Sequence, residues 1–523
     1  MNQIQSPATA SDARQRRTIL IAVCVALMAV VASVSGLNVA QPDLAVDLGA
    51  SQSTVLWIIN VYTLTLAALL LPLGALGDRL GRKPVLVTGL ILFGLASAVA
   101  GLAPSAGVML AARLVGGVGA AMIMPITLAV ITSTFPEEER GRAIGVWTGV
   151  AGGGGILGMF LSAALVDVAD WRRLFVLPVV LVVVALAMAL RSVPNSRETT
   201  PHSFDTAGAL TSVVAVVGLI FCLQEGPERG WSAPATLLGL AAGVLATLAF
   251  VIRELRRGPA ALLDVRLFRE RRLAGGSITL LAVFGVQAGI FVVLFPFFQE
   301  VLGWSGLLST SALMPMAVLM MATSGLAPRL AERIGARATM AGGVALAGTG
   351  LALMAAVVSV DGGYLSVLPG MLAMGAGMGL SMTPSTEAIT GSLPSERQGV
   401  ASALNDVTRE LGTALGVALL GALLSAGYRS AIDTRLDNVP DDTADTAREG
   451  IANAVDASRT AGPQAQGLVR AAQESFVDGW QRAMWVGVVV MGALLLYILA
   501  RGPQRPDAAA DDEPEHAVES TSM

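Results

Sequence analysis

Apolar runs of about 20 residues recur along almost the whole chain, separated by short polar or charged stretches. A helix of about 20 apolar residues crosses the hydrocarbon core of a bilayer, and we place about 14 such runs. The pattern predicts an all-α polytopic membrane protein. An even number of spans puts both termini on one side of the membrane.

The runs form two groups of six, over residues 18–191 and 273–501, with two further spans within residues 206–253. This division predicts two six-helix bundles and two extra central helices.

Three segments lie outside the spans: an N-terminal stretch over residues 1–17, a loop over 428–479 and a tail over 502–523. The loop shows weak helical periodicity near 446–457 and 468–476, but we favour a solvated loop. The composition of the tail is typical of disorder.

Most of the 34 Arg and Lys residues fall on the cytoplasmic side when the N-terminus is placed inside. This distribution satisfies the positive-inside rule, so we expect cytoplasmic termini. Arg14, Arg16 and Arg17 resemble the start of a signal peptide, but the apolar run after them is too long for one, and we expect an uncleaved first helix. The single lysine indicates a bacterial source and hence a bacterial cytoplasmic membrane.

The composition, with 54% hydrophobic and 14% charged residues, excludes a soluble globular protein. Cys24 and Cys222 fall inside predicted spans, which excludes a disulfide framework. Lys83 is the only lysine and follows Gly-Arg, so no GxxxxGK[ST] phosphate loop exists. We therefore expect no enzyme activity, cofactor, metal, ATP or nucleic acid, and we expect a monomer among membrane lipids.

A charged hairpin, GALGDRLGRK, separates two long apolar runs. Its cations mark a cytoplasmic surface, and its glycines allow two helix ends to approach closely. A similar segment, LAERIGAR over residues 330–337, lies at the equivalent place of the second group, and such internal repeats are common in secondary transporters. The alternative is a plain anchoring turn. The candidate gating residues are Gly74, Asp78, Arg79, Gly81, Arg82 and Lys83.

Charged residues inside spans are costly and are functional candidates. Asp406, Arg409 and Glu410 have i, i+3, i+4 spacing on one helix face, and one base between two acids leaves a carboxylate that can cycle a proton. The alternative is a salt bridge that orients the helix. Arg113 lies about two turns deep, and it is either functional or bonded to neighbouring helix carbonyls. Glu387, near the inner end of the twelfth span, is expected to be an interfacial group, and a coupling site is the alternative.

Aromatic, thioether and amide side chains recur at helical spacing in several spans, where they suit a permissive pocket for apolar or cationic ligands. The alternative is ordinary packing or lipid contact. The candidate cavity residues are Asn38, Gln41, Asn60, Phe284, Gln287, Phe291, Met374 and Met378.

The hairpin, the ARLVGGVGA stretch that begins before Arg113 and the SALNDVTRELGTALGVALLG stretch resemble the major facilitator superfamily. Within it they resemble the 14-helix drug:proton antiporters of the EmrB/QacA type. The resemblance implies the major facilitator fold, a hairpin that latches the two halves, proton transfer at Arg113, and small lipophilic or cationic substrates exported against protons.

Two departures from this family matter. Ser33 stands where a first-helix acid is expected and cannot carry a proton, and Gly158 to Ala163 lacks the proline of the antiporter signature. A proton-coupled uptake symporter or a lipid or metabolite transporter on the same fold therefore remains the alternative. Substrate identity, proton stoichiometry and the role of the extra helices are not encoded in a recognisable motif.

Overall fold

Each predicted apolar span is a long α-helix in the computed structural model, which describes residues 12–39, 41–168, 170–197, 204–436, 439–458 and 465–502. Fourteen helices of these residues are long and apolar enough to cross a membrane. Helices form because a bilayer offers no water to backbone N–H and C=O groups, which bond along the helix instead. The described residues contain no strand.

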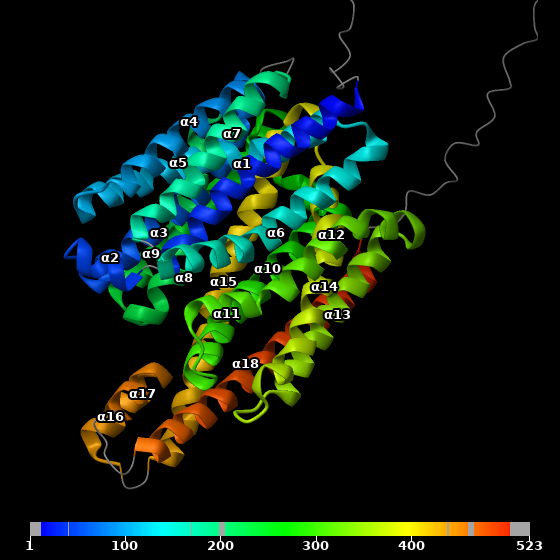
Figure 1. The fold of residues 1–523 in the computed structure, drawn as a ribbon. Coiled ribbons are helices and arrows are strands. Elements are labelled where there is room, and N and C mark those ends of the chain that lie inside the picture. Colours follow the sequence, from blue (N-terminus) through cyan, green and yellow to red (C-terminus); the bar gives the residue numbers. More distant parts are fainter. Residues whose placement is uncertain are drawn as a thin grey trace, which may run out of the picture.

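The two predicted groups of spans form two packed halves (Figure 1). The N-terminal half contains α1 (Ala13–Val39), α2 (Gln41–Asp47), α3 (Gln52–Leu80), α4 (Arg82–Gly101), α5 (Ala106–Thr134), α6 (Glu137–Val168) and α7 (Val176–Ser192). The C-terminal half contains α10 (Arg271–Pro296), α11 (Gly306–Ala312), α12 (Met314–Ile334), α13 (Ala336–Val357), α14 (Gly363–Thr390), α15 (Gln398–Ile432) and α18 (Ala465–Arg501). Between them in the chain lie α8 (Thr206–Arg229) and α9 (Pro234–Arg257).

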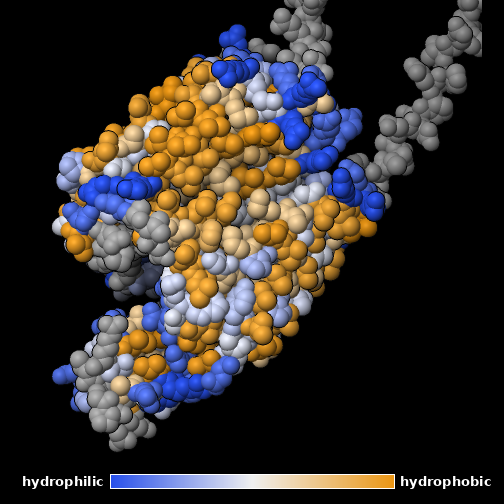
Figure 2. Space-filling view, viewed as in Figure 1, coloured by the Kyte–Doolittle hydropathy of each residue, from blue (hydrophilic) through white to orange (hydrophobic). Residues whose placement is uncertain are grey.

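The two ends of the bundle differ. The hairpin end carries the turn between α3 and α4, the start of α1 and the end of α18, and the loop end carries α16 (Asp441–Glu449) and α17 (Ile451–Ser458). Figure 2 shows hydrophobic side chains over the middle of one face and hydrophilic ones gathered toward the ends. Leu245 and Val489 are 65% and 70% exposed, as lipid-facing side chains of a spanning bundle are.

The loop end is more helical than the sequence predicts. Both α15 and α18 extend into the stretch assigned to a loop over 428–479, and α16 and α17 lie between them. The expectation of a solvated loop is therefore wrong for these parts. Packing explains the difference, because the Tyr428 hydroxyl donates to the Ala447 carbonyl at 2.8 Å and Ala454 is fully buried. Apart from Gly502, the predicted tail lies outside the described residues.

The two repeated segments take the same backbone turn. Gly81 ends α3 and Gly335 ends α12 with φ values of +109° and +94°, a region that favours glycine. Lys83 Nζ donates to the Leu190 carbonyl near the end of α7 at 2.8 Å, and Arg337 Nε donates to the Ile498 carbonyl near the end of α18 at 3.0 Å. Each half thus ties its hairpin to the end of its own last helix.

The extra helices α8 and α9 pack on each other through glycines. A Cβ on Gly218 would lie 2.5 Å from the backbone nitrogen of Gly243, so this approach requires a glycine in α8. The other side of α8 contacts both halves, because Val216 and Ile220 cluster with Ala67 of α3 and with Leu411 of α15. The pair therefore covers the seam between α3 and α15.

An ion cluster at the hairpin end holds the extra helices together. Asp205 caps α8 by accepting from the Gly208 N–H at 2.9 Å, and Arg253 and Arg257 of α9 pair with the same carboxylate at 2.7 and 3.0 Å. Burial disfavours the charged form, but the hydrogen bonds from Arg253, Gly208 and Arg257 outweigh it and lower the pKa of Asp205 to about 2.

Asp205→Asn is expected to lower the free energy of unfolding at pH 7 by about 2 kcal/mol, because it removes charge-assisted hydrogen bonds. The depressed pKa of Asp205 means that this contribution is complete above about pH 5 and declines as the pH falls through about 2. Thermal unfolding of both purified proteins between pH 3 and 8 tests this. The deficit in Tm should be constant from pH 5 to 8 and shrink below pH 4. Asp441→Asn, at an exposed position on α16, is the control, and a deficit that grows in acid would contradict the assignment.

Candidate functional site

The hairpin of the N-terminal half is locked onto the first turn of α15 in the C-terminal half. The Asp78 carboxylate accepts hydrogen bonds from the backbone N–H groups of Gly399 at 2.8 Å and Val400 at 3.0 Å. Arg82 Nη2 lies 2.9 Å from Asp78 Oδ1 and donates to the Ser395 carbonyl at 3.0 Å. The positive end of a helix dipole favours a carboxylate here. We call this set of contacts the latch.

Glycines let the latch close. A Cβ on Gly74 would lie 2.5 Å from the Gly399 carbonyl oxygen, and a Cβ on Gly399 would collide with Gly74 in turn. Asp78 and Arg82 are each only 2% exposed, so their charge-assisted bonds form away from water, where they are strong. Arg79 is exposed and makes no hydrogen bond or ion pair with the described residues.

A second contact closes the hairpin end on the other side of the bundle, between α6 and α12. Ser324 Oγ lies 3.0 Å from the Gly145 carbonyl and 2.8 Å from Thr383 Oγ1. Glu332 stands where the repeat places an equivalent of Asp78, but it is exposed. The buried acid of the latch therefore exists only in the first hairpin.

The charged residues predicted on α15 lie between the two halves. Asp406 is fully buried, and Arg409 Nη1 lies 3.4 Å from its Oδ1. The Arg409 guanidinium carbon lies 4.5 Å from the ring centre of Phe284 in α10 and 5.6 Å from that of Trp147 in α6. Both are cation–π distances, so Arg409 contacts aromatic rings from both halves.

Glu410 is the unpaired acid of this group. It makes no hydrogen bond or salt bridge with the residues that the structure describes, whereas Arg409 is paired with Asp406. A carboxylate within the bundle that lacks a hydrogen bond and a salt bridge is a candidate carrier for a proton.

Arg113 faces the same region from α5. Its Nη1 lies 3.1 Å from Ser33 Oγ, its Nε donates to the Ile58 carbonyl at 3.3 Å, and Nη2 has no partner among the described residues. The guanidinium carbon stacks 4.0 Å from the ring centre of Tyr62. Arg113 of α5 is therefore held against α1 and α3 of its own half.

The predicted cavity residues are dispersed. Phe284 and Gln287 are buried on α10, and Gln287 Oε1 has no partner among the described residues, whereas Phe291 and Asn60 are half-buried. Met374 and Met378 are buried on α14, and a Cβ on Gly350 would lie 3.1 Å from Met374 Cβ, so Met374 packs against α13 within its own half. The side chains of Asn38 and Gln41 lie outside the described part.

Trp147 was missed by sequence reasoning. Its indole donates to Thr127 Oγ1 at 3.0 Å, and it is fully buried beside Arg409. In the sequence, only the position of this tryptophan among the glycines of the fifth span could have pointed to it. Its contact with α15 depends on how the two halves pack, and no sequence motif indicates that contact.

The family model described as Major Facilitator Superfamily matches residues 22–417 of this chain. The chain belongs to the major facilitator superfamily. It is a multi-pass membrane protein of a family of transporters.

Curated relatives in this superfamily match along most of the chain. The "Multidrug efflux pump LfrA" of Mycolicibacterium smegmatis is 31% identical, over 84% of this chain and 87% of its own. The "Methyl viologen resistance protein SmvA" of Salmonella typhimurium is 30% identical, over 93% and 97%. The "Multidrug resistance protein Stp" of Mycobacterium tuberculosis is 29% identical, over 88% and 87%.

Solved structures of the superfamily share the fold. The proton:xylose symporter XylE matches with a TM-score of 0.58 and 15% identity, covering 94% of this chain and 96% of its own. The human organic anion transporter MFSD10 matches with a TM-score of 0.58 and 16% identity, covering 91% and 99%. The major facilitator fold expected from the sequence is thereby confirmed.

Asp78→Asn should open the hairpin end, because an amide loses the charge that strengthens the bonds to Gly399 and Val400, at a cost of about 2 kcal/mol. Ala403 lies under the latch and is fully buried. In a background with Cys24 and Cys222 replaced by alanine, we expect a water-soluble maleimide to label Ala403→Cys at least about tenfold faster when Asp78→Asn is present.

Arg79→Gln, one residue along and outside the latch, is the matched control and should leave the labelling rate unchanged. Equal rates with and without Asp78→Asn would show that the latch does not hold this end closed.

Proposed function

We propose that this protein exports amphipathic drugs or other small lipophilic compounds in exchange for protons, by alternating access between its two halves. The observation that carries the proposal is the Glu410 carboxylate of α15, which makes no hydrogen bond or salt bridge with the described residues while the latch closes one end. The names of the relatives, a multidrug efflux pump and resistance proteins, support drugs as the substrate class and export as the direction.

We place the hairpin end in the cytoplasm of a bacterial cell, with both termini on that side. The basic residues of the hairpin support this orientation, because cations accumulate on the cytoplasmic side of membrane helices. The structure is then closed to the cytoplasm by the latch and by the Ser324 contact with Gly145.

Glu410 is the proposed proton carrier, and Asp406 and Arg409 position it. Protonation of Glu410 from the outside removes an unpaired charge between the halves, and its deprotonation on the cytoplasmic side restores a carboxylate for a cationic substrate. One proton that moves down 100 mV of membrane potential supplies about 2.3 kcal/mol, enough for more than a tenfold concentration ratio. Ser33 contributes no proton but holds Arg113 in place.

The aromatic face of Phe284 is the proposed contact for the substrate. Arg409 now lies 4.5 Å from its ring centre, so a cationic or aromatic substrate competes with Arg409 for the same surface. Phe291, two turns along α10, continues that apolar surface.

Glu410→Gln is expected to abolish uptake of ethidium or methyl viologen into inside-out vesicles with an acidic lumen, and to abolish the lumenal alkalinisation that accompanies it. Substrate counterflow without a proton gradient should persist, because the variant keeps the shape of the site and loses only the proton. Glu396→Gln, an exposed glutamate at the hairpin end, is the matched control.

Normal gradient-driven transport by Glu410→Gln would remove this residue from coupling. Substrate that leaves the acidic lumen together with protons, in place of entering it in exchange for them, would indicate symport instead of export.

A further inference from the structure

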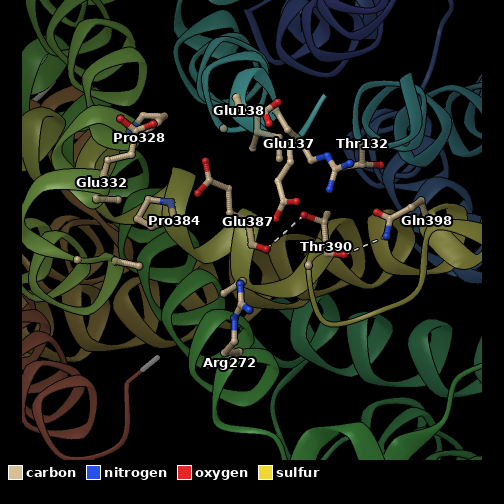
Figure 3. A pocket seen from close by; sticks show the side chains of 18 residues that line it. Thr132, Glu137, Glu138, Arg272, Pro328, Glu332, Pro384, Glu387, Thr390 and Gln398 are labelled. Carbon is tan, nitrogen blue, oxygen red and sulfur yellow. Dashed lines mark hydrogen bonds between the residues drawn. The ribbon is translucent and has the colours of Figure 1, made fainter. Parts of the chain in front are cut away.

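A polar cavity lies at the hairpin end between the two halves, separate from the charged group on α15 (Figure 3). Its volume is about 370 Å³, and α6 of the N-terminal half and α12 and α14 of the C-terminal half supply most of its walls. The latch lies on the other seam, between α3 and α15. Neither the proton pathway nor the substrate surface proposed above uses this cavity.

The cavity is acidic, and its acids come from both halves. Glu137 and Glu138 belong to α6, Glu332 to α12 and Glu387 to α14, against the two bases Arg140 and Arg272. Figure 3 shows the Glu387 carboxylate pointing toward the acidic side of the cavity and away from Arg272.

The two arginines are engaged with helix ends. Arg272 Nη2 would lie 3.4 Å from a Cβ on Gly391, at the C-terminal end of α14, where a cation complements the helix dipole. Arg140 Nη2 donates to the Phe135 carbonyl at 3.5 Å. Both bases therefore lie near helix ends as well as lining the cavity, where the four acids outnumber them.

Two buried acceptors that line this cavity lack partners among the described residues. Glu387 Oε1 is one, and it would lie 2.8 Å from a Cβ on Gly141 of α6, which places it at the junction of the halves. Gln398 Oε1 is the other. Gln398 is only 5% exposed, and its Nε2 donates to the carbonyls of Thr390 and Leu393 at 3.0 Å each, which leaves its oxygen on the cavity side. An unsatisfied buried acceptor destabilises a folded protein, so both favour a ligand with N–H donors.

We propose that this cavity binds a small organic polycation, with one ammonium between Glu387 and Gln398 and another beside Glu137 and Glu138. An ammonium group offers three donors and no acceptor, which matches the unpartnered oxygens. No group of three or more acids, histidines or cysteines in the described residues converges on a point that could hold a metal ion. The spread of charge therefore fits an extended cation better than a compact one.

A cation in this cavity contacts both halves only while the hairpin end is closed. Because a ligand shifts a conformational equilibrium toward the state it binds better, the polycation stabilises the closed hairpin end and slows transport. This inhibition rests on the alternating access proposed above, whereas the binding itself does not.

Spermidine is the probe, titrated by calorimetry into the full-length protein in detergent at fixed ionic strength, with MgCl₂ as the comparison salt. We expect saturable spermidine binding and no comparable binding of Mg²⁺. Glu387→Gln should weaken spermidine binding at least about tenfold, because a buried charge pair is lost. Glu138 is exposed on α6 of the N-terminal half, so Glu138→Gln should weaken spermidine binding by a smaller but measurable factor. Glu396→Gln should leave it unchanged.

Asp78→Asn reports on the link to closure, since it opens the latch without touching the cavity and should also weaken spermidine binding. Binding that is equal in wild type and Glu387→Gln, or that Mg²⁺ reproduces at the same ionic strength, would overturn the site. Binding lost in Glu387→Gln but unchanged in Asp78→Asn would overturn the stabilisation of the closed end and leave the export proposal untouched.

Discussion

The bonds between one buried carboxylate and the start of one helix join the two halves of this transporter at the hairpin end. Asp78 satisfies the first backbone N–H groups of α15, which would otherwise lack partners at the helix terminus, and Arg82 neutralises the carboxylate. The same bonds hold the N-terminal half to the C-terminal half. Any step that opens the hairpin end must expose this acid and this helix end to water together.

The helix α15 connects the latch to the proposed proton site. Val400 and Glu410 are 10 positions apart on one uninterrupted helix, which corresponds to about 15 Å. A helix transmits a tilt or a shift over that distance as a rigid element. A charge change at Glu410 therefore has a direct mechanical route to the Asp78 contact, whereas the second seam, between α6 and α12, has no buried acid at the equivalent position.

The sequence predicts much of this arrangement where the information is local. Apolar length specifies the spans, glycine spacing specifies the hairpin, and helical spacing puts Asp406, Arg409 and Glu410 on one face. Contacts between helices are not local: Arg113 stacked on Tyr62, and Trp147 beside Arg409, depend on how α3, α5, α6 and α15 pack. At the loop end, weak periodicity indicates helices near 446–457 and 468–476, but their burial depends on distant partners such as Tyr428 and cannot be read from that periodicity.

We infer that the charge on Glu410 controls the latch at the start of the same helix, α15. Spin labels at Arg79 and Glu396, both exposed on opposite sides of the seam at the hairpin end, measure this opening by pulsed electron double resonance. We expect a short distance between the two labels at pH 8 and a longer one at pH 5.5 in the otherwise unmodified protein. In Glu410→Gln we expect the longer distance at both pH values. A distance that is the same at both pH values in both proteins would contradict it.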